Sequence, residues 1–233
     1  MQRLGFTRSA HQADHLLLTP DTFVRAPRPG MQNATAIVHV APAAGAKFTQ
    51  YTAEFEPGGQ LGPVDGERFL YVLQGTVAVD GRTLGPGGYA YVPPGCDASI
   101  TAGAAARAAV IEKPYDGASP PAMLLGDESS VASKPLMDDP DLQVRALIPD
   151  DPAFDFAVNT MAFQPGAALG MVEAHVMEHG LLMLEGGGIY RLGDCWYPVT
   201  AGDFIYMAPY CPQWFGAIGK VPAKYLIYKD WNR

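Results

Sequence analysis

The sequence is poor in basic residues and contains no long apolar run. Of its 233 residues, only 16 are lysine or arginine against 24 aspartate or glutamate, so the net charge is −8 and the pI is near 5.0. Nucleic acids and anionic membrane surfaces both require a basic footprint, so neither is an expected partner. No apolar stretch approaches the roughly 20 residues of a membrane span, and the first residues lack the apolar core of a secretory leader. We therefore expect a cytoplasmic protein that acts on a small molecule.

Cysteine is also scarce. The three cysteines are an odd number and show no CxxC spacing: Cys96, Cys195 and Cys211. Neither a disulfide framework nor a cysteine-based zinc site is expected from such a set.

Glycine and proline are abundant, with 26 and 21 residues, and they separate short apolar runs. This distribution favours many short strands joined by tight turns over helices. Hydrophobic residues make up 48% of the chain and charged residues 17%, which is enough apolar material for a buried core. The sequence therefore predicts a globular, all-β protein.

The two halves of the sequence resemble each other. AKFTQYTAEFEPGGQLG (46–62) aligns with FDFAVNTMAFQPGAALG (154–170), and Phe55 and Phe163 are separated by the same 108 positions as Gly58 and Gly166. Alternating apolar residues, a glycine turn and a further strand then recur in both halves after small shifts of register. We expect two copies of one strand-rich domain: residues 1–118 with an irregular N-terminal arm, a linker over 119–140, and residues 141–233.

The segment EAHVMEHG, residues 173–180, carries the clearest chemistry. In an extended strand, Glu173, His175 and His179 would share one face, with Glu178 on the other. Two imidazoles and a carboxylate form a nitrogen and oxygen donor set that suits manganese, iron or zinc. The alternative for so short a motif is a polar strand with its histidines in water.

The spacing of this segment resembles the first motif of the cupins, which are small antiparallel jelly-roll barrels with metal ligands inside. Most cupins have histidine, histidine and glutamate where this chain has Glu173, His175 and His179, followed by Gly186 at the family spacing. The second cupin motif runs from a glycine to a histidine eleven positions on, and here Gly202 leads to Gln213. A glutamate, two histidines and a glutamine resemble the set of one group, the two-domain (S)-ureidoglycine aminohydrolases.

The resemblance extends over the whole chain and implies a function. It implies that manganese, or another divalent metal, is bound by Glu173, His175, His179 and Gln213. It also implies that Tyr190, Tyr225 and Lys229 contact the substrate. Because a carboxylate can leave the metal when the substrate binds, we expect Glu173, as a general base, and Lys229 to be the catalytic residues. The alternative is that Glu173 is only a ligand. The expected reaction converts (S)-ureidoglycine, a small anionic ureido amino acid, into (S)-ureidoglycolate and ammonia during allantoin and purine breakdown. Strand parity agrees in part, because Tyr225 and Lys229 would share a face of the last strand.

The first copy lacks the corresponding ligands. Counting back from Gly75 by the spacing that joins Gly186 to its ligands gives Gly62, Val64 and Arg68, and the place of Gln213 falls on Ala98. Three of these side chains offer no ligand atom, and an arginine repels a cation. We expect the N-terminal domain to be metal-free and structural.

Two other functions remain open at this stage. One is a different metal-dependent cupin enzyme, such as an iron dioxygenase acting on a small acid, and the other is a ligand-binding cupin without turnover. The fold cannot choose between them, because cupins host many chemistries. Exposed sheet edges need covering, so we also expect a homo-oligomer.

Overall fold

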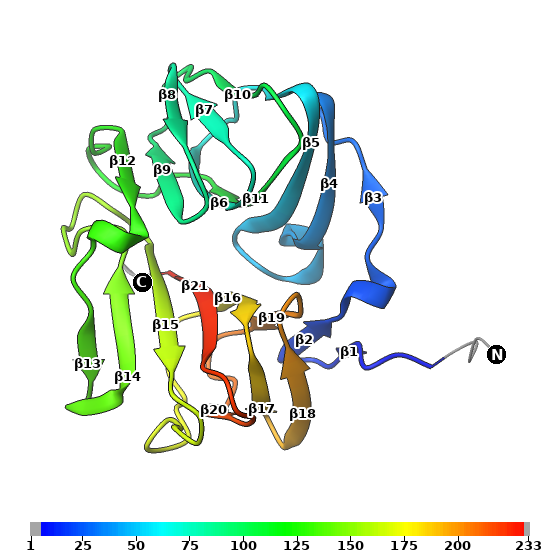
Figure 1. Cartoon of the computed structure of the whole chain (residues 1–233), viewed down its shortest axis with the longest axis vertical. Helices are drawn as coiled ribbons and strands as arrows, with labels where there is room; N and C mark the ends of the chain where they lie inside the picture. Colours follow the sequence, from blue (N-terminus) through cyan, green and yellow to red (C-terminus); the bar gives the residue numbers. More distant parts are fainter. Residues whose placement is uncertain (1–5, 231–233) are drawn as a thin grey trace. The chain divides into compact units, whose positions relative to one another are not determined.

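The computed structural model describes residues 6–230, and their regular structure is almost entirely β (Figure 1). The described chain divides into two compact units. The N-terminal barrel comprises Val24–Ala132 and Leu147–Asp155, and the C-terminal barrel comprises residues 6–23, 133–146 and 156–230. The all-β prediction is confirmed. Within residues 6–230, no helix is long and apolar enough to cross a membrane.

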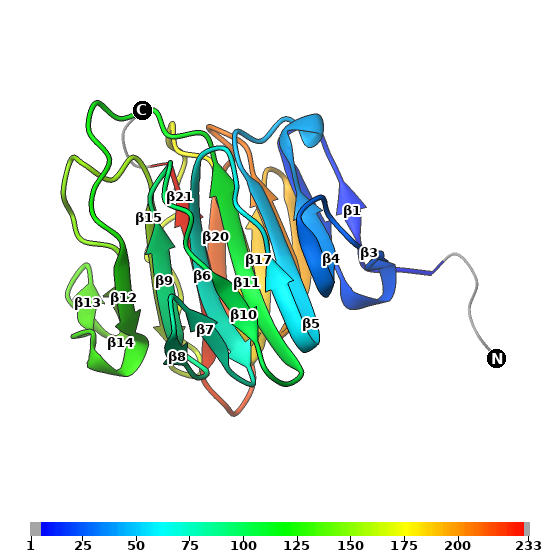
Figure 2. The same ribbon diagram turned by 90° about the horizontal axis from the view of Figure 1, so that it is seen from above.

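The N-terminal barrel is one antiparallel sheet in which β4, β5, β11, β6 and β9 run side by side (Figure 2). The strand order is β12-β9-β6-β11-β5-β10-β7-β8, with β4 pairing to β5 and β3 pairing to β4. The strands are β3 (Arg25–Ala26), β4 (Met31–Val40), β5 (Thr49–Leu61), β6 (Glu67–Gln74), β7 (Val77–Val79), β8 (Arg82–Leu84), β9 (Gly88–Val92), β10 (Ile100–Ala102), β11 (Ala106–Lys113) and β12 (Leu124–Asp127).

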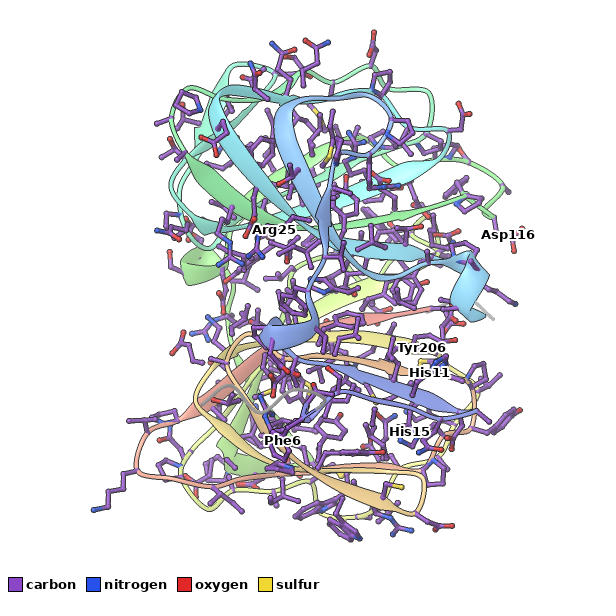
Figure 3. The ribbon with its side chains drawn as sticks, turned by 90° about the vertical axis from the view of Figure 1, so that its right-hand side faces the viewer. Phe6, His11, His15, Arg25, Asp116 and Tyr206 are labelled. Atoms are coloured by element: carbon purple, nitrogen blue, oxygen red, sulfur yellow. The ribbon has the colours of Figure 1, made fainter. Side chains whose placement is uncertain are left out.

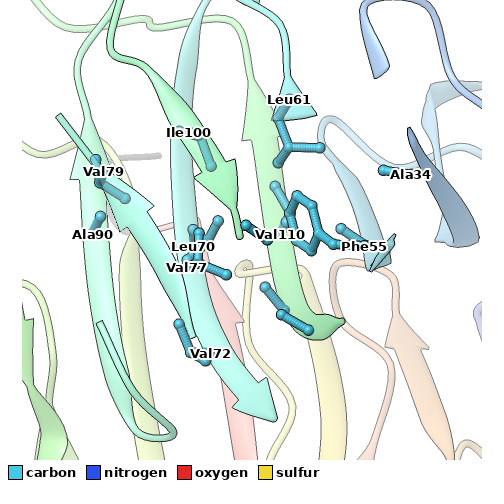
Figure 4. Close-up of a cluster of buried hydrophobic side chains, with 14 of the residues drawn as sticks. Ala34, Phe55, Leu61, Leu70, Val72, Val77, Val79, Ala90, Ile100 and Val110 are labelled. Carbon is cyan, nitrogen blue, oxygen red and sulfur yellow. The ribbon is translucent and has the colours of Figure 1, made fainter. Parts of the chain in front are cut away.

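The interior of the N-terminal barrel is apolar (Figure 4). Alternate residues of its strands, among them Phe55, Leu70, Val72 and Val110, are buried in one cluster. This is the period of two expected when one face of a sheet covers a core. Parity therefore places Arg68 and Glu112 on the same inner face as this cluster.

His39 is a buried, uncharged histidine in the N-terminal barrel. It is 3% exposed, its Nε2 lies 2.9 Å from Thr52 Oγ1, and burial followed by repulsion from Arg107 lowers its pKa to about 3. Because the pKa is lowered on folding, this residue favours the folded state above pH 6.5, and that contribution is lost as the pH falls towards 3. We expect His39→Gln to flatten the acid side of the stability curve by up to about 1.4 kcal/mol per pH unit.

Urea unfolding between pH 7 and pH 4 measures this effect. His11→Gln, the same substitution at an exposed position, provides the control. A wild-type slope retained in His39→Gln would contradict the assignment.

The C-terminal barrel consists of two sheets. The larger has the order β1-β2-β19-β16-β21-β15-β14-β13, and the smaller has the order β18-β17-β20. The strands are β1 (Ala10–His11), β2 (His15–Leu18), β13 (Lys134–Leu136), β14 (Asp139–Ala146), β15 (Ala157–Phe163), β16 (His179–Glu185), β17 (Gly187–Leu192), β18 (Cys195–Thr200), β19 (Phe204–Met207), β20 (Gln213–Ala217) and β21 (Ala223–Lys229). Their inward residues form a second buried core that includes Phe163, Tyr190, Phe215 and Tyr225.

The N-terminal arm is more regular than the sequence indicated. β1 and β2 form a hairpin, and β2 pairs with β19 so that His15 lies opposite Met207 (Figure 3). Figure 3 labels His11 on β1, His15 on β2 and Tyr206 on β19. A turn of 3-10 helix, η1 (Pro20–Thr22), follows, and two more occur in the N-terminal barrel, η2 (Pro42–Ala44) and η3 (Glu128–Ser130). The arm thus adds two strands to the C-terminal barrel.

The segment expected as a linker, residues 119–140, also contains strands. It includes β12 in the N-terminal barrel, and β13 with the first residues of β14 in the C-terminal barrel. Leucines at 124, 125 and 136 give these strands partly buried apolar side chains.

Matched glycines support the repeat. Gly75 and Gly186 end β6 and β16 with φ of +71° and +61°, and a Cβ at either would collide with a carbonyl oxygen, that of Ala105 or Pro222. Only glycine tolerates both the left-handed conformation and so close an approach. The same type of turn therefore follows β6, which carries Arg68, and β16, which carries His179.

Candidate metal centre

The segment that precedes β16 is a loop, which corrects the prediction of a continuous strand over residues 173–180. Of residues 173–180, only the last two, His179 and Gly180, belong to β16. Glu173 forms an isolated bridge with Gln213. Its N–H donates to Gln213 O at 2.8 Å, and the Gln213 N–H donates back to Glu173 O at 2.8 Å. Tyr210 N–H donates to His175 O at 2.7 Å. Residues 174–178 do not pair with a neighbouring strand. The positions of the side chains in this segment are therefore set by these backbone contacts and not by strand alternation.

Three side chains nevertheless approach one atom of a fourth, Nε2 of His175. His179 Nε2 lies 3.3 Å from it, Gln213 Nε2 lies 3.1 Å from it, and Glu173 Oε2 lies 3.9 Å from it. His179 and Gln213 are buried, whereas the side chains of Glu173 and His175 are about 30% exposed. The predicted set is therefore brought together, with two members inside the barrel and two at its accessible side.

The two histidines present nitrogen atoms suited to metal ligation. His179 Nδ1 lies 3.1 Å from Tyr228 O, so it carries the proton and leaves the Nε2 lone pair directed at His175. Burial, followed by the positive charge of Lys229, lowers the pKa of His179 to about 3. A neutral imidazole is the form that binds a metal.

The two shorter distances, from His175 Nε2 to His179 and to Gln213, fit neighbouring ligands of one divalent ion. Neighbouring ligands of an octahedral ion with bonds of about 2.1 Å are separated by about 3 Å, close to the two shorter contacts of His175 Nε2. A half-turn of the Gln213 carboxamide exchanges its oxygen and nitrogen, which presents Oε1 at the same place. Two nitrogens and two oxygens without a thiolate suit manganese, iron or zinc.

The charge of Glu173 acts on all three of the expected substrate-contacting residues. Burial raises the pKa of Tyr190 and of Tyr225, and the Glu173 carboxylate raises both further. Burial lowers the pKa of Lys229, which Glu173 partly opposes. Among the described residues, neither tyrosine hydroxyl has a hydrogen-bond partner. Two hydroxyl groups and an ammonium thus accompany the metal-ligating set.

A supporting network behind His179 was not foreseen from the sequence. Glu178 is 1% exposed, its N–H donates to Asp230 Oδ1 at 2.7 Å, and its Oε2 accepts from Tyr206 OH at 3.2 Å. The sequence predicted only that Glu178 faces away from His179. An acidic side chain in a polar motif gives no sign of burial before the register of β16, β19 and β21 is known.

A second group of possible metal-binding atoms occurs in the same barrel. Asp14, His15 and Cys211 place one carboxylate oxygen, one ring nitrogen and one sulfur within 4.8 Å of one another. The imidazole of His15 is already engaged on both sides, with Asp14 Oδ1 at 2.8 Å and Tyr197 OH at 2.9 Å. Burial raises the pKa of the Cys211 thiol to about 12, so it is protonated. The two hydrogen bonds of His15 instead link the arm to Tyr197 on β18.

The corresponding end of the N-terminal barrel holds an ion pair. Arg68 lies opposite Glu112 in the β6–β11 ladder, as His179 lies opposite Lys229 in the β16–β21 ladder. Glu112 Oε1 accepts from Arg68 Nε at 2.9 Å and from Tyr51 OH at 2.7 Å, and Oε2 accepts from Arg28 at 2.8 Å. The positive charges of Arg68 and Arg28, together with the Tyr51 hydrogen bond, outweigh burial and lower the pKa of Glu112.

Comparison with known proteins identifies the family. Residues 42–115 match the EutQ-like cupin domain, and residues 159–228 match the cupin domain. The (S)-ureidoglycine aminohydrolase of Arabidopsis thaliana is 41% identical to this chain, over 98% of this chain and 80% of its own length. The chain belongs to the (S)-ureidoglycine aminohydrolase family. The resemblance read from the sequence is thus confirmed, as are the two cupin domains.

A second curated relative and a solved structure are also similar over most of their length. The Escherichia coli K12 enzyme of that name is 33% identical over 93% of this chain and 88% of its own. The crystal structure of protein YlbA from E. coli superposes with a TM-score of 0.85 at 30% identity, covering 97% of this chain and 95% of that one.

Proposed function

We propose that this chain catalyses the manganese-dependent hydrolysis of (S)-ureidoglycine to (S)-ureidoglycolate and ammonia. The observation that carries the proposal is the convergence of Glu173, His179 and Gln213 on His175 Nε2, with Lys229 close enough to sense the charge of Glu173. The relatives named as (S)-ureidoglycine aminohydrolases support the choice of substrate. An ion held by the four side chains would supply a Lewis acid and a template for the substrate.

The remaining polar groups suit the other parts of this substrate, whose reacting carbon carries an amine, a ureido group and a carboxylate. Lys229 binds the carboxylate as a compact point charge. Tyr190 and Tyr225 donate their hydroxyl protons to carboxylate or ureido oxygens. These contacts fix which face of the carbon meets water, and therefore the stereochemistry of the product.

Glu173 has a second role in this proposal, as general base. It accepts a proton from the attacking water, whose oxygen forms the new C–O bond while the C–N bond breaks. The departing amine takes that proton and leaves as ammonia, so the reaction consumes one water and returns Glu173 to its starting state. Its partial exposure gives the carboxylate room to turn between a ligand and a base.

Ammonia release tests the proposal. Protein stripped of metal and then reconstituted with manganese should release ammonia from freshly prepared (S)-ureidoglycine, with ureidoglycolate formed in equal amount. The metal-free protein should show only the background rate. A reaction without protein is the control, because the substrate decays spontaneously.

Absence of release above background from folded, metal-loaded protein would contradict the proposal. Oxygen consumption with iron bound would favour a dioxygenase, and ligand binding without turnover would favour a binding protein. We further propose that manganese is the resident metal, that the N-terminal barrel binds none, and that the protein is a cytoplasmic homo-oligomer.

A further inference from the structure

Asn159 contacts the ammonium group of Lys229. In the carboxamide orientation that satisfies both ends of the side chain, Oδ1 accepts from Lys229 Nζ at 3.2 Å and Nδ2 donates to Val158 O at 3.1 Å. Among the described residues, this is the only side-chain hydrogen bond to Lys229 Nζ. Asn159 lies on β15, next to β21, which carries Lys229.

Both side chains point into the C-terminal barrel. On β15, Met161 and Phe163 share the parity of Asn159 and belong to the buried core. On β21, Tyr225 and Ile227 share the parity of Lys229 and belong to the same core. The amide therefore reaches Lys229 from inside the barrel.

The N-terminal barrel contains the same arrangement with the charge reversed. Tyr51 lies 108 positions before Asn159, the offset of the sequence repeat, and its hydroxyl donates to Glu112. Glu112 occupies the ladder position that corresponds to Lys229. In both barrels, an uncharged polar side chain on the neighbouring strand thus contacts a charged residue, Glu112 on β11 or Lys229 on β21.

We propose that Asn159 is a positioning residue that holds Lys229 for the substrate carboxylate without neutralising it. An amide oxygen accepts one of the three ammonium protons and leaves two for an anionic ligand. A carboxylate at the same place would pair with Lys229 and compete with the substrate. The proposal rests on the proposed function, in which Lys229 binds that carboxylate.

Two substitutions at Asn159 separate positioning from packing. Asn159→Asp keeps the size and the acceptor but adds a negative charge, so we expect the Michaelis constant to rise at least about tenfold. Asn159→Ala removes the acceptor, together with the donor to Val158 O, without adding a charge, and we expect a rise of about three- to tenfold. In both variants kcat should change much less, since the contact with the carboxylate exists in the ground state and in the transition state.

Packing would produce the opposite order. If Asn159 only filled space, alanine would be more harmful than the isosteric aspartate, and loss of thermal stability and metal content would accompany the loss of activity. Gln143→Glu on the adjacent strand β14 makes the same amide-to-acid change at a side chain bonded to Pro140 O, and it should behave as wild type. An unchanged Michaelis constant in Asn159→Asp would overturn the proposal.

A binding measurement keeps this test independent of the reaction. Calorimetric titration of the manganese-loaded protein with glycolate, an inert small carboxylate, should show weaker binding in the order wild type, Asn159→Ala, Asn159→Asp. If wild type binds glycolate but does not hydrolyse (S)-ureidoglycine, the proposed reaction fails while the role of Asn159 is still tested. Equal glycolate affinities in all three proteins would overturn that role.

Discussion

Replacing Glu173 with glutamine is expected to lower kcat by about a hundredfold or more while leaving manganese content nearly unchanged. Glutamine keeps an oxygen that can face the metal, and the backbone bridge to Gln213 does not depend on the side chain. It cannot accept a proton from water, and removal of a general base typically costs between about 10² and 10⁴ in rate. The loss should therefore appear in turnover rather than in metal binding.

Steady-state kinetics combined with metal analysis of the same sample distinguishes these effects. Glu185→Gln makes the same change at an exposed position at the end of β16 and should leave both quantities unaltered. If the activity of Glu173→Gln is restored in proportion to bound manganese, Glu173 acts as a ligand alone and the general-base role is wrong.

Replacing Lys229 with methionine is expected to raise the Michaelis constant about ten- to hundredfold. Hydrogen bonds to charged groups contribute about 1.5–3 kcal/mol, and methionine keeps the apolar stem while removing the ammonium. Metal content should stay intact, because Lys229 contributes no ligand. In a protein with a net charge of −8, a small anion depends strongly on such a local positive charge.

Lys224→Met supplies the control for this substitution. Lys224 lies on the same strand β21 but on its outer face, where it pairs with Glu185 at 3.9 Å. The control should retain the wild-type Michaelis constant. If the Michaelis constant is also unchanged in Lys229→Met, Lys229 does not bind the substrate carboxylate and the proposed contact is wrong.

Much of the site could be predicted because spacing and parity are written in the sequence. The shared inner face of Tyr225 and Lys229 follows from alternation along β21, and both residues lie where this predicts. The repeat with its matched glycines predicted two barrels, since left-handed turns restrict the residue type at fixed places. The position of Gln213 could also be predicted from its spacing to Gly202, because a single turn joins β19 to β20.

The remainder depends on long-range register, which a single sequence does not contain. Glu173 and His175 reach the site from a loop that is bound to β20 and to the turn at Tyr210, and no alternation along the loop reveals this. Asn159 has no unusual neighbours in sequence, and its contact with Lys229 exists only because β15 pairs with β21. The repeat offset did contain a signal, since it aligns Asn159 with Tyr51.

The pairing of β2 with β19 also constrains the order in which the chain can fold. His15 lies opposite Met207, so the two strands are separated by about 190 residues of intervening chain. During synthesis, every strand of the N-terminal barrel leaves the ribosome before β19 exists. Closing so long a loop is entropically costly and slow. The first strands to be made therefore join their sheet among the last, and until then the edge of β19 stays open to pairing with another chain.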